Sequence, residues 1–83
     1  MHARQLLLIR PKPLPDELLS SWLVRLAWEN GRKLHPFSVK GLGLPRNFWY
    51  ADIDRSVHPE ELANIAEVTG TDPARVKATT LVS

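Results

Sequence analysis

The 83-residue sequence predicts an all-α fold: a small helical domain with helix-turn-helix-like hairpins and an extended, proline-containing N-terminal arm. Three observations predict it. Apolar residues recur at helical spacing in two stretches, glycine follows each stretch where a helix would end, and no strand pattern of any length occurs. A chain this short holds one domain with one modest core, so we assign residues 1–83 to a single domain.

Residues 1–15 are expected to form the extended arm. Pro11, Pro13 and Pro15 each fix their own backbone and bias the preceding residue away from helix. The apolar run over residues 6–9 would pack as a short strand or a loose clip over the core. We interpret the stretch as an entry arm, and the alternative is a polyproline ligand for an aromatic groove.

Residues 16–50 are expected to contain the first helix and an aromatic loop region. Asp16 and Glu17 lie where acidic side chains favour the positive end of a helix, and Asn30-Gly31 is a stop signal. The apolar residues between them share one face of that helix, which predicts these core residues: Leu18, Leu19, Trp22, Leu23, Leu26 and Ala27.

The middle of the chain gives weaker signals. Residues 36–42 favour a short second helix, and residues 45–50 favour a compact turn or short helix that brings Phe48, Trp49 and Tyr50 together. Residues 51–56 are polar and are expected to form a linker.

Residues 57–83 predict a helix-turn-helix-like hairpin. Pro59 with two following acids begins one helix, Gly70 ends it, and Asp72-Pro73 begins another. In this hairpin a small residue permits a close helix crossing, glycine supplies the turn, and a branched apolar residue packs back. The residues predicted to have these structural roles are Ile65, Ala66, Gly70 and Val76; Thr80 and Leu81 are expected to face inward too, and Arg75, Lys77 and Thr79 outward.

The same spacing occurs 39 residues earlier. Leu23, Leu26, Ala27 and Gly31 match Leu62, Ile65, Ala66 and Gly70, and Phe37 then matches Val76. Two copies are too few to establish a repeat, so duplication and chance likeness both stay open.

Charge is distributed unevenly along the chain. Residues 1–50 carry eight Lys or Arg and three acids, whereas residues 51–83 carry three Lys or Arg and six acids. A polyanion would therefore be attracted mainly to the first half. The candidate nucleic-acid-binding residues are Arg32, Lys33, Lys40 and Arg46, near His35 and the aromatic segment, together with Arg75 and Lys77 on the last helix. The alternative for this group is an ordinary solvated surface.

The tryptophans divide into two kinds. Trp22 belongs to the apolar face, whereas Trp28 follows six residues later, about 240° around an ideal helix, and leaves that face. Trp28 is expected either to fold over the aromatic segment or to be an exposed partner contact, and Trp49 is the second candidate partner contact. Arg25 is expected to tie the first helix to a loop carbonyl, and the alternative is that it binds a partner.

Several classes of protein are disfavoured. The absence of cysteine excludes disulfides and thiolate zinc sites, and fits a cytoplasmic protein. The longest apolar run, Leu6 to Ile9, is far shorter than the roughly 20 residues of a membrane span. The three histidines are scattered and no nucleophile stands beside a base, so we expect no enzyme, cofactor or metal site.

The stretch Pro-Lys-Pro-Leu-Pro-Asp-Glu-Leu-Leu-Ser-Ser-Trp-Leu-Val-Arg-Leu-Ala-Trp-Glu-Asn-Gly, residues 11–31, resembles the start of the TniQ family. That family opens with a proline-rich arm, then Pro-Asp-Glu, then a Leu-x-Ser-Trp-Leu-x-Arg-Leu-Ala helix ending in Asn-Gly. Residues 59–70, with Val76, Thr80 and Leu81, resemble the family's next segment. The resemblance covers residues 6–82.

The resemblance implies a role in transposon target-site selection. TniQ-like proteins, including the TnsD type, link a target-recognition element, either DNA or a CRISPR effector complex, to the transposon's AAA+ ATPase regulator. It implies a helical, helix-turn-helix-like N-terminal region, and it leaves a homodimer open. A cysteine-rich zinc segment normally follows, and its absence here leaves a truncated chain or a minimal member; the ending Leu-Val-Ser just past the last expected helix favours truncation. A stand-alone helix-turn-helix transcriptional regulator is the alternative.

Overall fold

The structure is all-α, which confirms the predicted fold class. The computed structural model describes residue 7 and residues 9–81. In this part of the chain no strand occurs and no helix is long and apolar enough to cross a membrane. The helical elements are α1 (Leu19–Glu29), α2 (Leu34–Pro36), the π-helical η1 (Phe37–Gly41), the 3-10 helix η2 (Phe48–Tyr50), α3 (Ile53–Ser56), α4 (Pro59–Thr69) and α5 (Pro73–Lys77).

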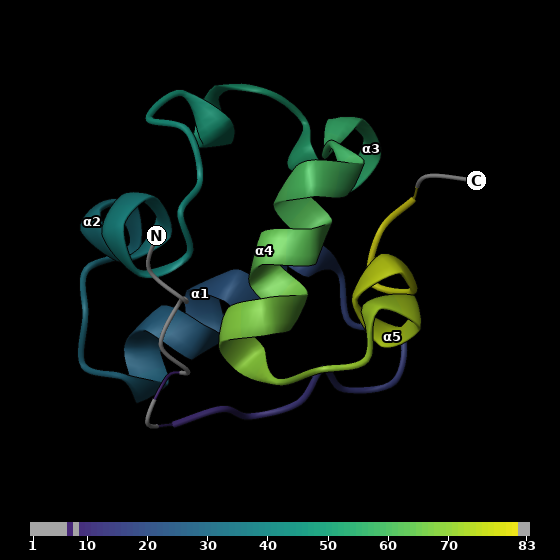
Figure 1. Cartoon of the computed structure of the whole chain (residues 1–83), viewed down its shortest axis with the longest axis horizontal. Coiled ribbons are helices and arrows are strands. Elements are labelled where there is room, and N and C mark those ends of the chain that lie inside the picture. Colours follow the sequence, from purple (N-terminus) through teal and green to yellow (C-terminus); the bar gives the residue numbers. More distant parts are fainter. Residues whose placement is uncertain (1–6, 8, 82–83) are drawn as a thin grey trace.

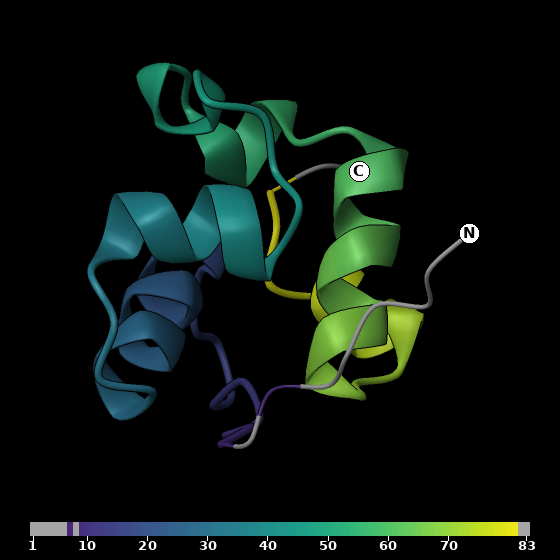
Figure 2. The ribbon, with the colours of Figure 1, turned by 60° about the vertical axis from the view of Figure 1, so that its left-hand side comes forward.

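One hydrophobic core joins these elements. In Figure 2, α1 and α2 lie on one side and α4 and α5 on the other, and the arm passes between them at the bottom of the view. Leu19, Trp22, Leu23 and Leu26 are fully buried, so the apolar face of α1 does meet the rest of the protein. Leu18 is exposed and precedes the helix. From the second half of the chain, the core takes Ile53, Val57, Ile65, Ala66, Val68 and Val76.

The first helices of the two hairpins, α1 and α4, end in the same way. Gly31 and Gly70 have φ angles of 64° and 62°, the left-handed conformation that glycine adopts without steric cost. The residue after each glycine donates its N–H to the buried alanine five positions earlier, at 2.9 Å in α1 and 3.1 Å in α4. Phe37 and Val76 are both fully buried. The likeness between the two segments therefore extends from sequence spacing to backbone geometry.

The start of α1 differs from the prediction. Asp16 and Glu17 do not cap it, because Asp16 has a φ of 64° and the helix begins only at Leu19. Leu18 occupies the N-cap position and offers no side-chain acceptor. The first N–H groups instead find partners far along the chain: Leu19 N donates to Thr79 O at 2.8 Å, and Ser20 N donates to Asp54 Oδ1 at 2.9 Å.

The expected linker over residues 51–56 is wrong. Residues Ile53–Ser56 form α3, whose Ile53 is 3% exposed and belongs to the core. Asp54 turns toward α1, where it accepts the Ser20 hydrogen bonds. The segment reads as polar because only one of its six residues is a large apolar side chain, and that one is the anchor.

The starts of the last two helices follow the sequence signals. At α4, His58 is the N-cap and its N–H donates to Glu61 Oε1 at 2.9 Å. At α5, Asp72 accepts from Ala74 N at 2.8 Å. Two orientations beyond α5 were predicted wrongly. Thr79 is 4% exposed rather than outward, since its backbone carbonyl meets α1, and Leu81 is exposed.

Candidate interaction surface

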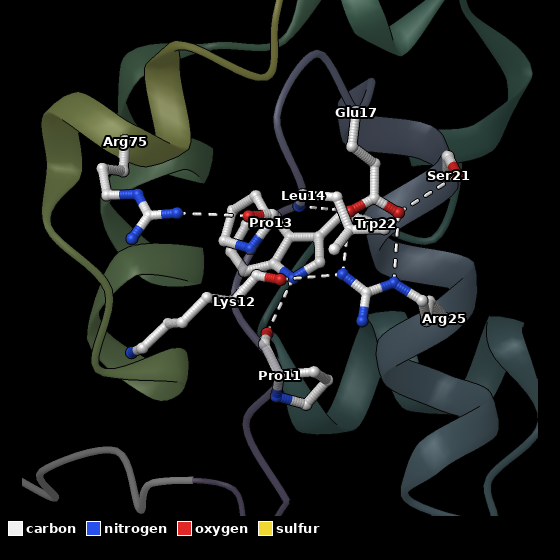
Figure 3. Close-up of polar contacts among 9 residues, drawn as sticks. All are labelled: Pro11, Lys12, Pro13, Leu14, Glu17, Ser21, Trp22, Arg25 and Arg75. Carbon is white, nitrogen blue, oxygen red and sulfur yellow. Dashed lines mark hydrogen bonds and ion pairs between the residues drawn. The ribbon is translucent and has the colours of Figure 1, made fainter.

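The N-terminal arm is fixed in place by side chains from both halves of the domain. Trp22 Nε1 donates to Pro11 O at 2.9 Å and Arg25 donates to Lys12 O at 2.8 Å, both from α1. From the opposite side, Arg75 of α5 donates to Pro13 O at 3.1 Å. Figure 3 shows these three consecutive carbonyls meeting donors from the flanking helices. The Arg25 contact confirms its predicted tie to a loop carbonyl.

Further contacts extend this attachment toward the N-terminal side of the arm. Leu7 N donates to Val68 O of α4 at 3.0 Å, and Asn30 Nδ2 donates to Ile9 O at 2.9 Å. Neither Leu7 nor Ile9 lies in a strand, so over these residues the apolar run is a clip; residues 1–6 and 8 lie outside the described residues. The arm is thus part of the scaffold that positions the outer surface.

An ion pair stabilises the same region, where the arm leads into α1. Arg25 and Glu17 approach to 2.8 Å, with the Glu17 side chain only 7% exposed. The Arg25 hydrogen bond is the main cause that lowers the pKa of Glu17, and it outweighs the effect of burial. The same bond raises the pKa of Arg25. Both groups therefore remain charged at neutral pH, and Glu17 also accepts from Leu14 N at 2.9 Å.

Lys12 closes the arm against the α4–α5 turn. Its Nζ donates to Gly70 O at 2.9 Å and lies 3.4 Å from both Thr69 O and Thr71 Oγ1. A cation here satisfies carbonyls at the negative end of α4. The basic side chains of the arm and of α5 that make these contacts are occupied by the protein itself.

The four predicted nucleic-acid-binding residues of the middle segment behave differently. Within the described chain, the side chains of Arg32, Lys33, Lys40 and Arg46 are exposed and make no hydrogen bond or ion pair. They lie on the turn after α1, on α2–η1 and on the loop that follows, the region at the left of Figure 1. His35 Nε2 lies 3.1 Å from Arg46 O and ties that loop back to α2.

The predicted sites on α5 are divided between two situations. Lys77 is exposed, whereas the Arg75 guanidinium is bound to the arm carbonyl of Pro13. The sequence could not indicate this, because Pro13 and Arg75 lie 62 residues apart. Arg75 is exposed as well, so in the described part of the chain Lys77 is the cation of α5 whose side chain makes no hydrogen bond or ion pair.

The aromatic candidates also differ in exposure. Trp28 is 82% exposed, but Trp49 is half-buried, with its indole N–H donating to Ser38 Oγ at 2.9 Å. Trp49 also meets Phe48 edge-on, with ring centroids 5.5 Å apart. Tyr50, which the sequence predicts to lie together with Phe48 and Trp49, is 88% exposed. The alternation follows from the single 3-10 turn, which buries Phe48 and directs Tyr50 outward.

Two hollows lie on this surface. One, of about 450 Å³, is lined by Trp28, Gly31, Arg32 and Lys33. The other, of about 350 Å³, lies between the η2 loop, α3 and the start of α4, with Phe48 and Val57 in its wall and His58 at its rim. No group of three or more His, Asp or Glu side chains in the described ranges is arranged to hold a metal ion.

A model of the protein family described as TniQ matches residues 8–83. No curated protein and no solved structure matches the chain. The family match covers the arm from residue 8 onward, the helices described above and the surface just described.

Proposed function

Because this chain belongs to the TniQ family and has a transposition-associated role, we propose that it is a non-catalytic adaptor in DNA transposition. It links target-site recognition, by DNA or a CRISPR effector complex, to the transposon's AAA+ regulator, and it acts in the cytoplasm. The resemblance of residues 11–31 to the family's opening motif supports this. Trp28 and Trp49 are its proposed partner contacts, and Trp28 offers the larger exposed ring.

The observation that carries the adaptor proposal is the contact between Arg75 and Pro13 O. A helix that reads the major groove presents several free polar side chains to base edges. The helix α5 is only five residues long and one of its two cations holds the arm, while Thr79, which follows the helix, is buried. The α4–α5 pair is therefore better suited to packing and docking than to reading DNA.

Nucleic acid is proposed to meet residues 32–46 instead. Arg32, Lys33, Lys40 and Arg46 are the cations there whose charge no described acid neutralises. Contacts of this type bind the phosphate backbone and depend steeply on salt. The acidic second half of the chain is proposed to contact the protein partner.

One observation favours a second function, a stand-alone helix-turn-helix regulator. Ala66 and Val76 are buried on either side of Gly70, the arrangement that such a motif requires. In that function Lys77 would meet DNA directly and binding would depend on sequence.

The test uses the purified chain and the AAA+ ATPase encoded with it, with binding measured by biolayer interferometry with and without target DNA. An adaptor binds the ATPase, and binds duplex DNA weakly at about 200 mM salt. Tight, sequence-dependent duplex binding with no ATPase binding would establish the regulator instead. Sedimentation of the same samples reports whether the chain forms the homodimer that the family resemblance leaves open.

A further inference from the structure

The hollow at the end of α1 combines an exposed aromatic ring with two free cations. Its lining consists of Trp28, Gly31, Arg32 and Lys33. A Cβ built on Gly31 would meet no atom within 4 Å, so the space above the backbone is open. Trp28 is 82% exposed. Leaving the largest side chain in water is unfavourable unless a ligand covers it.

The backbone around this hollow leaves the two cations free for an anion. The carbonyls of Leu26, Ala27 and Trp28 would normally attract cations at a helix C-terminus. They already accept N–H groups from Asn30, Arg32 and Gly31 at 3.1 Å, 2.9 Å and 3.0 Å. The charge of the nearby acid Glu29 acts on Arg25, on another side of α1.

We propose that this hollow binds an unpaired nucleotide, whose base stacks on Trp28 and whose phosphates meet Arg32 and Lys33. A planar base matches the indole face, and a flexible single strand can place a phosphate beside a stacked base. This rests on the proposed nucleic-acid contact of residues 32–46 and names its ligand: a splayed base in RNA or single-stranded DNA.

The size of the hollow distinguishes this ligand from a folded protein. Four residues line a space of about 450 Å³, within the range of pockets that hold one small ligand. A stable protein interface covers about 800 Å² on each partner with an apolar centre. Around Trp28 the other exposed apolar side chain on α1 is Val24, which alone makes no such centre.

The test measures binding of dye-labelled oligothymidine and oligouridine of about ten nucleotides, the length that one small module covers. Trp28→Ala is expected to weaken binding of at least one of them about 5- to 150-fold, and Trp28→Phe only slightly. Tyr50→Ala, which removes an equally exposed ring elsewhere, is the matched control and should bind like the wild type.

Tryptophan emission supplies an independent signature. Oligonucleotide should quench the emission of the wild type, and Trp28→Phe should bind without that quenching. An abasic oligomer of the same length should bind more weakly and quench nothing. The oligothymidine and oligouridine arms separate a DNA source from an RNA source.

The proposal is overturned if Trp28→Ala binds as tightly as the wild type, or if the abasic oligomer binds as tightly as the intact one. It is also overturned if polyglutamate competes as well as oligonucleotide does, because that would point to an acidic protein partner. The variant Arg32→Glu with Lys33→Glu separates the two levels of inference. If it loses binding while Trp28→Ala does not, the basic contact stands and the stacking site falls. If the wild type binds no oligonucleotide, the basic contact falls as well.

Discussion

Asp54 of α3 caps α1 across 34 residues of sequence by accepting two hydrogen bonds from Ser20. The backbone N–H donates to Oδ1 at 2.9 Å and the hydroxyl donates to Oδ2 at 2.8 Å. The residue directly before the first turn of a helix normally supplies this cap. Here Leu18 stands at that position, so the helix depends on a distant carboxylate.

Asp54→Ala is therefore expected to destabilise the fold by about 1–2 kcal/mol, the upper range for losing an N-cap. Urea unfolding followed by circular dichroism measures it. Asp52→Ala is the control, because that exposed carboxylate meets only exposed Arg55 and should change stability little. Equal effects of the two variants would show that Asp54 does not act as a cap.

Trp22 is expected to be the most sensitive single residue. Trp22→Ala should cost about 3–5 kcal/mol, the range for a buried aromatic, and a domain this small tolerates little of that loss. Trp22→Phe keeps a ring in the core but loses the bond to Pro11 O, so it should cost less and loosen residues 11–13 selectively. Thermal unfolding and hydrogen exchange report these two effects. Unchanged unfolding of Trp22→Ala would mean that α1 does not bury this face.

The Glu17–Arg25 ion pair predicts a pH dependence of stability. Since the folded protein lowers the pKa of Glu17, its stabilisation is fully present above the ordinary value of 4.5 and is lost as the pH falls through the lowered pKa. Glu17→Gln should therefore be less stable than the wild type at neutral pH. The gap should narrow as the pH falls below 4.5.

Urea midpoints measured between neutral pH and about pH 3 test this difference. Glu29→Gln is the comparison, since the Glu29 side chain acts on Arg25 only through its charge, without a hydrogen bond in the described part of the chain, and should show a smaller gap. A gap that stays constant with pH would rule out ionisation of Glu17 as its cause.

The two helix-ending glycines should respond alike to substitution. Gly31→Ala and Gly70→Ala each force a Cβ into the left-handed region, at a cost of about 1–2 kcal/mol. The Asn variants should cost less, because asparagine tolerates this conformation. Chemical denaturation of all four variants compares the two hairpins directly. A loss at one glycine but not the other would show that the shared geometry does not carry shared energetics.

The sequence predicted local features well where a signal lies within one helical turn. The apolar face of α1, the stops at Gly31 and Gly70, and the start of α4 at Pro59 each follow from neighbouring residues. It failed at Asp16, Glu17 and residues 51–56. A carboxylate near a helix can cap it or pair with a cation, and its position in the sequence does not distinguish these two roles.

By itself, the sequence determined the fold class, the helix periods, the family motif and the basic character of residues 32–46. Tertiary structure alone decided which polar groups are free. Arg75 meets Pro13 and Asp54 meets Ser20 because the chain returns to the arm and to α1 after tens of residues. Hydrogen bonds act over about 3 Å in space, whereas local pattern extends over only a few positions along the chain.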